Sequence, residues 1–238
     1  MNGASHARTA AGALAAASLV VGAVAVAVVE VNRRPVTTER PPLAAVSLPA
    51  RPPETPTPSP TRPAGPPGAY RLKLKGQYQW TSYYCEPAAG SMSLATFGIK
   101  VDQNKLARKM KTKVGGTIGD DAAIVLEHYI HPQHYSDTIV TDVSGHPRTL
   151  MSKVVYDVGT LHRAPVLQVY MERLPWNSGR GYGQKAAHAI VAYGYRRSSG
   201  TITVYDPWRP TGGTHTLSAR TLAKALQPTG GMHYIERY

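Results

Sequence analysis

The feature that most limits what this chain can fold into is the stretch from Arg34 to Pro67, which is almost entirely proline, threonine, serine, alanine and arginine. A segment with so few large apolar side chains cannot bury enough surface to offset the conformational entropy that folding removes. We therefore expect a disordered, Pro/Thr-rich linker over residues 34–69. The folded domain is then predicted at residues 70–238, a length sufficient for a substantial core.

An apolar run precedes the linker. Residues Ala10 to Val29 are almost all alanine, valine, leucine and glycine, and Arg8 stands before them. The run is close to the ~20 residues that span a bilayer, while Ala23-Val24-Ala25 offers a small-residue cleavage pattern. Residues 1–33 are thus predicted to be a signal peptide or a membrane anchor. The protein is expected to be exported, either extracellular or held at the outer face of the plasma membrane by this segment.

The predicted domain is strongly basic. Residues 71–238 carry 21 Lys and Arg against 11 Asp and Glu, so about +10 of the formal charge of +13 belongs to them. Such a surface attracts anions. There is no basic-aromatic array typical of nucleic-acid binding, and export argues against access to nucleic acid, so no nucleic-acid partner is expected. Anionic cell-envelope polymers are the expected neighbours.

The periodicity of apolar residues changes from helical to extended at Pro165. The predicted helices cover 85–97, a segment capped by Asp102, a segment from Thr117 or Asp120 to Pro132, and 149–158 with Gly159 as its stop. The predicted strands cover 166–171, 189–195, 201–206 and 231–238, with a short helix at 218–226 before the last. This order indicates an α+β domain in which N-terminal helices pack on a C-terminal antiparallel sheet.

Cys85 is the only cysteine and stands where the first of these helices begins. Pro87 suits the first turn of a helix and Gly98 suits its end. Unpaired backbone N–H groups and the helix dipole at that position favour a thiolate, which is the nucleophilic form. The alternative is a small buried apolar side chain. A lone thiol that cannot form an internal disulfide in an exported chain favours the nucleophile.

A hairpin supplies candidate partners for this thiol. If its turn is centred near Arg197, His188 lies directly opposite Asp206 on adjacent strands, with Cβ atoms ~5 Å apart. The carboxylate would then hold Nδ1–H of the imidazole and leave Nε2 for the thiol. A register error of one residue would put the two side chains on opposite faces. The alternatives are a histidine at a strand start and a turn-forming aspartate before Pro207.

Together these residues resemble a known family. The motifs that carry the resemblance are Gln79, Cys85-Glu86-Pro87-Ala88-Ala89, Gly115-Gly116-Thr117, Ala187-His188-Ala189-Ile190-Val191 and Tyr205-Asp206-Pro207-Trp208. This set is similar to the bacteriocin-processing peptidase family (peptidase family C39, papain-like clan), in its secreted, stand-alone branch. The resemblance spans most of the predicted domain and implies a papain-like fold.

The resemblance also implies roles. Cys85 would be the nucleophile, His188 the general base and acid, and Asp206 the group that orients the imidazole. Gln79 would donate to the oxyanion together with the backbone N–H of Cys85. Gln77 is the nearby competitor for that role, but the spacing to the cysteine favours Gln79.

One position departs from the family pattern. The residue after the cysteine is usually glycine, and here it is Glu86, which places a carboxylate beside the thiolate and leaves reduced activity open. The sequence predicts an exported cysteine peptidase that hydrolyses a peptide or amide bond of a peptide or protein through a thioester acyl-enzyme. The alternatives are a cell-wall endopeptidase or amidase, and a catalytically weak module that binds envelope peptides or polymers. No cofactor or metal is expected.

Overall fold

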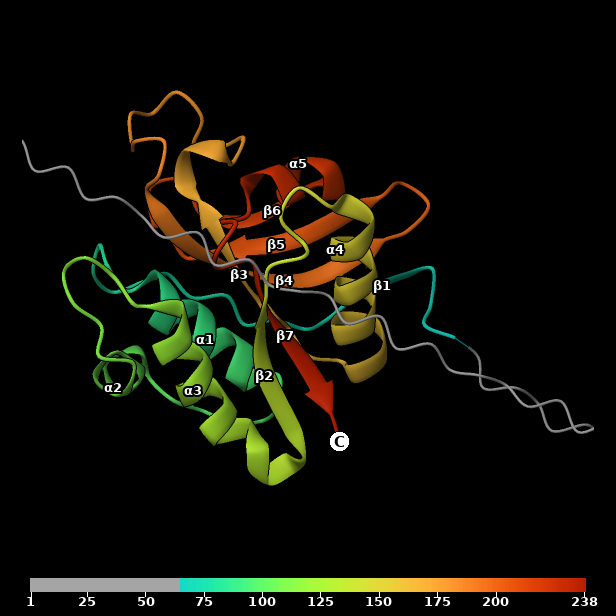
Figure 1. Ribbon diagram of the computed structural model, residues 1–238, viewed down its shortest axis with the longest axis horizontal. Coiled ribbons are helices and arrows are strands. Elements are labelled where there is room, and N and C mark those ends of the chain that lie inside the picture. Colours follow the sequence, from blue (N-terminus) through green and yellow to red (C-terminus); the bar gives the residue numbers. More distant parts are fainter. Residues whose placement is uncertain (1–64) are drawn as a thin grey trace, which may run out of the picture. The chain divides into compact units, whose positions relative to one another are not determined.

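The computed structural model describes residues 65–238 (Figure 1). The α-helices are α1 (Cys85–Ala95), α2 (Gln103–Lys109), α3 (Gly119–Ile130), α4 (Pro147–Val154) and α5 (Ala219–Ala225). The strands are β1 (Ala69–Arg71), β2 (Tyr135–Val140), β3 (Val166–Tyr170), β4 (Ala187–Arg196), β5 (Thr201–Asp206), β6 (Gly213–Ser218) and β7 (Met232–Arg237). Two short 3-10 helices, η1 (His131–Gln133) and η3 (Met171–Arg173), and a π-helix, η2 (Val155–Leu161), complete the order.

The predicted signal peptide or anchor at 1–33 and all but the last residues of the predicted linker lie outside the described residues. Within residues 65–238, no helix combines the length and apolar character needed to cross a membrane. Pro67 and Gly68 already contact the folded body, because Tyr195 Oη donates to the Pro67 carbonyl at 2.8 Å and Arg197 N donates to the Gly68 carbonyl at 2.8 Å.

The strands form one sheet in the order β2-β7-β3-β4-β5-β6, with β1 also pairing to β4. Every pairing is antiparallel. The last strand in the chain, β7, therefore lies inside the sheet, between the early strand β2 and the strand β3. The sheet is complete only when this last strand has paired on both sides.

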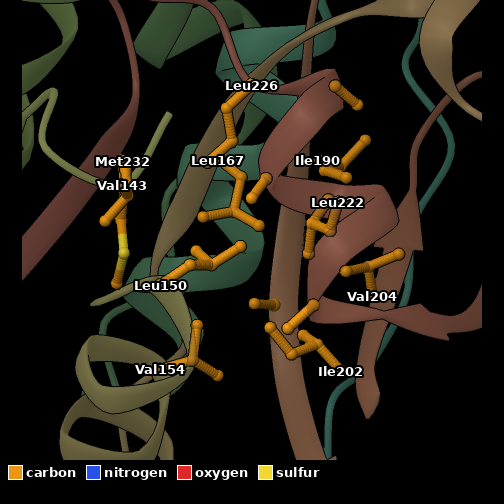
Figure 2. Packing of buried hydrophobic residues seen from close by; sticks show 14 of the residues in the cluster. Val143, Leu150, Val154, Leu167, Ile190, Ile202, Val204, Leu222, Leu226 and Met232 are labelled. Atoms are coloured by element: carbon orange, nitrogen blue, oxygen red, sulfur yellow. The ribbon is translucent and has the colours of Figure 1, made fainter. Parts of the chain in front are cut away.

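Successive side chains of the central strands point to opposite faces of the sheet and so belong to two separate hydrophobic cores. On one face, Val166 and Val191 pack with residues of α1, α2 and α3. On the other, Leu167 and Ile190 pack with residues of α4, η2 and α5, as Figure 2 shows. Helices thus cover both faces of the sheet (Figure 1). The domain has the α+β architecture that the sequence predicts, with the N-terminal helices α1, α2 and α3 packed on the sheet.

The predicted helix signals act as expected in several places. Asp102 is the N-cap of α2, where its side chain accepts a hydrogen bond from Lys105 N at 2.9 Å. Ser218 caps α5 in the same way, accepting from Thr221 N at 3.0 Å. Strand β5 has the predicted bounds, and the helix that carries Cys85 begins at that residue.

Other predictions of secondary structure are wrong. Gly159 does not end the helix before it, because the backbone continues as η2 to Leu161 and turns at His162, whose φ is 58°. The glycine is needed for close packing, since a Cβ there would collide with the Tyr195 hydroxyl. Strands β1, β2 and β6 are absent from the prediction. Strand β6 lies at the sheet edge, where exposed polar side chains leave little apolar alternation to detect.

The predicted register of the β4–β5 hairpin is also wrong. Near the turn Arg196 pairs with Thr201, whereas farther from it Val191 pairs with Tyr205, and the register shifts between Ala192 and Gly194. Continued along the strands, the second register puts Asp206 opposite Ile190 rather than His188. The shift of one residue is decisive, because the register near the turn would put His188 and Asp206 on opposite faces.

Candidate active site

Cys85 is the first residue of α1 and is partly buried. No side chain caps this helix end, and Tyr84 occupies the N-cap position. The N–H groups of the first turn have no partners within the helix, so they remain available to an anion at the thiol or on a bound carbonyl oxygen. Pro87 lies in this first turn without loss of a hydrogen bond. The local sequence thus places the thiol at the positive end of a helix dipole.

His188 and Asp206 form a buried hydrogen-bonded pair. The imidazole Nε2 lies 2.7 Å from Asp206 Oδ1, and the two side chains are 2% and 0% exposed. The two side chains are in contact, as the sequence predicts, but they occupy diagonal positions on adjacent strands rather than directly opposed ones. Diagonal positions are roughly 7–8 Å apart, so the far nitrogen of the ring reaches the carboxylate. The predicted assignment of Nδ1 to Asp206 and Nε2 to the thiol is therefore wrong.

The Asp206 carboxylate has three hydrogen-bond donors. Besides His188, Trp208 N donates to Oδ1 at 2.8 Å and the Trp176 indole Nε1 donates to Oδ2 at 2.7 Å. Burial raises the pKa of Asp206, but the charge and hydrogen bond of His188 and the two N–H donors lower it by more, so the net shift is downward. Asp206 is an anion at neutral pH.

The Cys85 side chain lies close enough to His188 to affect its pKa. Burial lowers the pKa of His188, but Asp206 raises it by charge and hydrogen bonding and Cys85 raises it further, so that the pKa reaches about 10. The ring is therefore an imidazolium at neutral pH, and its Nε2–H is directed to Asp206. Thiol, imidazole and carboxylate thus stand in the order that nucleophile, base and orienting group need.

Gln79 lies next to this group. Its backbone N–H donates to the Pro207 carbonyl at 2.9 Å, which joins it to the segment that follows Asp206. The side chain is buried, Nε2 donates to the Thr81 carbonyl at 2.8 Å, and Oε1 has no partner. Only one of the two amide hydrogens is used, so the second is free to donate to a substrate.

Gln77, the other candidate donor to the oxyanion, forms hydrogen bonds with other residues. Gln77 Nε2 donates to Ser91 Oγ at 2.8 Å, and Gln77 Oε1 accepts from Gln103 Nε2 at 3.0 Å. Gln103 Nε2 also donates to the Tyr78 carbonyl at 2.9 Å. Gln77 thus belongs to a network that holds the segment before Cys85.

Glu86 does not lie free beside the thiol. It is buried, and its Oε1 is 3.4 Å from His233 Nε2, while His233 Nδ1 is 2.8 Å from Asp137 Oδ1. Sequence reasoning missed His233 and Asp137, because each stands singly in a strand far from Cys85 in the chain. Only the pairing of β2 with β7 brings them together. Among residues 65–238, no group of three or more His, Cys, Asp or Glu side chains is arranged to hold a metal ion.

The helix-borne thiol, the strand-borne imidazole and the buried carboxylate stand in an α+β domain of papain-like fold. The model of the Peptidase_C39 like family matches residues 71–233. The chain therefore belongs to the Peptidase_C39 like family, as the motifs in the sequence predict. A comparison with curated proteins found no match.

Solved structures with this fold include C39 peptidases. A putative C39-like peptidase from Bacillus anthracis is 16% identical, with a TM-score of 0.50 over 71% of this chain and 97% of the other. The peptidase domain of Streptococcus ComA, described as a bi-functional ABC transporter, is 16% identical, with a TM-score of 0.47 over 71% of this chain and 99% of that one. At this level of identity the likeness shows the fold alone.

Proposed function

We propose that this protein is an exported cysteine peptidase that hydrolyses a peptide or amide bond through a thioester acyl-enzyme. The observation that carries the proposal is the buried His188–Asp206 pair, joined at 2.7 Å, with Cys85 at the start of α1 beside the imidazole. Membership in a peptidase family supports the same reaction class. Export rests on the apolar run at Ala10 to Val29.

The first half of the reaction uses the thiolate–imidazolium pair. Cys85 Sγ attacks the carbonyl carbon, and the oxygen that becomes negative accepts hydrogen bonds from Cys85 N–H and from the free amide hydrogen of Gln79. His188 Nδ1 then gives its proton to the leaving amine as the C–N bond breaks, which leaves a thioester on Cys85. Asp206 holds the ring in place through Nε2 during this transfer.

The second half reverses the proton movement. A water molecule gives a proton to His188 Nδ1 while its oxygen attacks the thioester carbon. Collapse of the second tetrahedral intermediate breaks the C–S bond, releases the carboxylic acid and restores the thiolate–imidazolium pair. The positive charge of residues 71–238 supports a location near anionic cell-envelope polymers and a substrate among the peptides or proteins found there.

The test is labelling by iodoacetamide and by an activity-based thiol probe, with the wild type and the Cys85→Ala variant. A peptidase labels fast at neutral pH, at one site that the variant lacks, and turns over generic peptides. A protein whose thiol reacts no faster than a free cysteine, and only above its ordinary ionisation near pH ~8.5, is instead a binding module for envelope peptides or polymers.

A further inference from the structure

A second buried cluster of titratable side chains lies beneath the first turn of α1. It consists of Glu86 from α1, His233 from β7, Asp137 from β2 and Gln168 from β3. His233 is at its centre, with Nδ1 2.8 Å from Asp137 Oδ1 and Nε2 3.4 Å from Glu86 Oε1. The amide group of Gln168 lies 3.0 Å from the same His233 nitrogen, and its oxygen faces the ring when that nitrogen carries a proton. Four elements thus meet at one imidazole.

The cluster is closed to solvent and tightly built. Glu86 is 4% exposed, Asp137 6%, Gln168 7% and His233 0%. Glycines flank Gln168 on two sides, and a Cβ at Gly119 or Gly230 would collide with its amide. A buried charged group persists only where partners compensate it, so this packing defines a specific arrangement rather than an accidental contact.

The charges in the cluster are complementary. Burial lowers the pKa of His233, but Asp137, Glu86 and, from α3, Asp120 raise it to about 9, so the ring is an imidazolium at neutral pH. The pKa of Glu86 is raised, because burial outweighs the opposing charge of His233. Glu86 Oε1 has no hydrogen-bond partner among the described residues, so its contact with His233 is electrostatic. The charge of His188, the candidate catalytic base, also lowers the pKa of Glu86, so the two buried groups of side chains are coupled electrostatically.

We propose that His233 is a positioning residue for the nucleophile: by binding Glu86 it fixes the first turn of α1, and so Cys85, against the sheet strand that carries His188. Glu86 lies between Cys85 and Pro87 in the first turn of α1, so a contact that holds its side chain also restrains the backbone that carries the thiol. The inference rests on the proposed function, because it assigns a role in the same site. It also accounts for a carboxylate next to a thiolate, whose charge His233 neutralises.

The test uses the full chain and needs no peptide substrate. Cys85 alkylation by iodoacetamide is measured across pH 5–10 for wild type, His233→Gln, Glu86→Ala and Glu86→Gln, with a melting curve for each. Displacing a reacting group by about 1 Å can cost ~10²-fold in rate, so His233→Gln and Glu86→Ala are expected to slow alkylation at least about tenfold at neutral pH and to change its pH profile. Glu86→Gln, whose amide oxygen can still accept from His233, is expected to lose clearly less.

Met232→Ala is the matched control. Met232 lies on β7 directly before His233, but its side chain is buried in the core on the other face of the sheet. Its truncation lowers stability without acting on Glu86, so alkylation should keep the wild-type rate and pH profile. If His233→Gln does not fold, the comparison of Glu86→Ala with Glu86→Gln decides.

Two results would overturn the inference. One is wild-type alkylation in both His233→Gln and Glu86→Ala. The other is equal slowing in those variants and in Met232→Ala at the same loss of melting temperature, which would make the cluster merely structural. The proposed function fails separately, if wild-type Cys85 itself reacts no faster than a free cysteine.

Discussion

Trp176 donates its indole N–H to Asp206 Oδ2 at 2.7 Å, on the opposite oxygen from the one that His188 occupies. The indole also stacks on His215, with ring centroids 3.8 Å apart. The carboxylate that orients the candidate base is therefore held from two sides. This makes Trp176 part of the support of the site rather than only a lining residue of it.

We expect Trp176→Phe to weaken this support while keeping the stacking. Losing one donor removes a hydrogen bond to a charged group, worth about 1.5–3 kcal/mol, so kcat should fall roughly tenfold and the melting temperature should drop. The pKa of Asp206 should rise, which moves the acid-side loss of activity to higher pH. The measurement is kcat/KM between pH 4 and pH 8. His215→Gln removes the stacking partner but keeps an amide N–H that can still donate to the Thr211 carbonyl, so the acid limb should stay in place. An equal displacement of the acid limb in His215→Gln would show that the indole N–H is not its cause.

Replacing Asp206 tests whether the site works as a Cys–His–Asp triad or as a Cys–His pair alone. Asp206→Asn should lose less turnover than Asp206→Ala, because an amide still orients an imidazole. Asp206→Ala should lower kcat by roughly 10²- to 10⁴-fold, the range of general acid–base contributions, and Cys85→Ala should abolish turnover. Kinetics with a generic peptide and melting curves give the comparison. Full activity in a folded Asp206→Ala protein would reduce Asp206 to a residue of the turn before Pro207.

The two neighbouring glutamines should behave differently. Gln79→Ala is expected to lower kcat about 10²- to 10³-fold with little change in KM, because it removes an oxyanion donor, and to lower the melting temperature less than Gln77→Ala, because only its hydrogen bond to Thr81 is lost. Gln77→Ala breaks hydrogen bonds to Ser91 and Gln103 and should instead cost about 1–3 kcal/mol of stability. Steady-state kinetics and thermal unfolding separate the two effects. A mainly catalytic loss at Gln77 would exchange their assignments.

Gly212 is expected to be essential for the shape of the segment that carries Asp206. A Cβ there would collide with the backbone carbonyl oxygens of Asp206 and Trp208, which cannot move without displacing the carboxylate. Gly212→Ala should therefore lose both stability and turnover. Gly115→Ala is the control, since nothing lies within 4 Å of its added Cβ. Urea unfolding and kcat for the pair are the measurements, and wild-type turnover in Gly212→Ala would contradict the expectation.

Alkaline pH should destabilise the folded protein through its two buried histidines. The folded pKa values of His188 and His233, about 10 and about 9, both lie above the ordinary value of 6.5. Their contribution to the free energy of unfolding is thus complete below pH 6.5 and is lost as the pH rises through 9 and 10. Melting temperatures between pH 6.5 and pH 10 test this. His233→Gln should flatten the decline between pH 6.5 and about 9, where His233 is protonated only in the folded state. An unchanged slope would show that His233 is neutral in the folded state.

The sequence was sufficient to place the helix that begins at Cys85, the strand 201–206 and the family. These features depend on local signals, namely a proline in a first turn, a switch of apolar period and a motif of consecutive residues. The proximity of His188 to Asp206 was also foreseen, but from a register that the structure does not have. The register shift between Ala192 and Gly194, which no local signal announces, returns both side chains to one face.

The surroundings of Glu86 could not be foreseen from the sequence. A carboxylate beside a thiol predicts a penalty when only neighbours in the chain are considered. The negative charge of Glu86 is opposed by His233 of β7. Asp137 of β2 binds this histidine, although the residue directly opposite His233 in the β2–β7 pairing is Ile139. Contacts of this kind depend on strand order, which alternation of apolar residues does not specify.

The interior position of β7 has a consequence for how the protein folds. Strand β7 follows its partners β2 and β3 in the chain, yet it must be seated between them, and it brings His233 to Glu86, the neighbour of Cys85. A partly folded chain in which β7 is not yet paired leaves two strand edges open and the first turn of α1 without this support. Because these pairings join residues that are far apart in the sequence, we expect them to close late in folding and Cys85 to gain its final position only at that step.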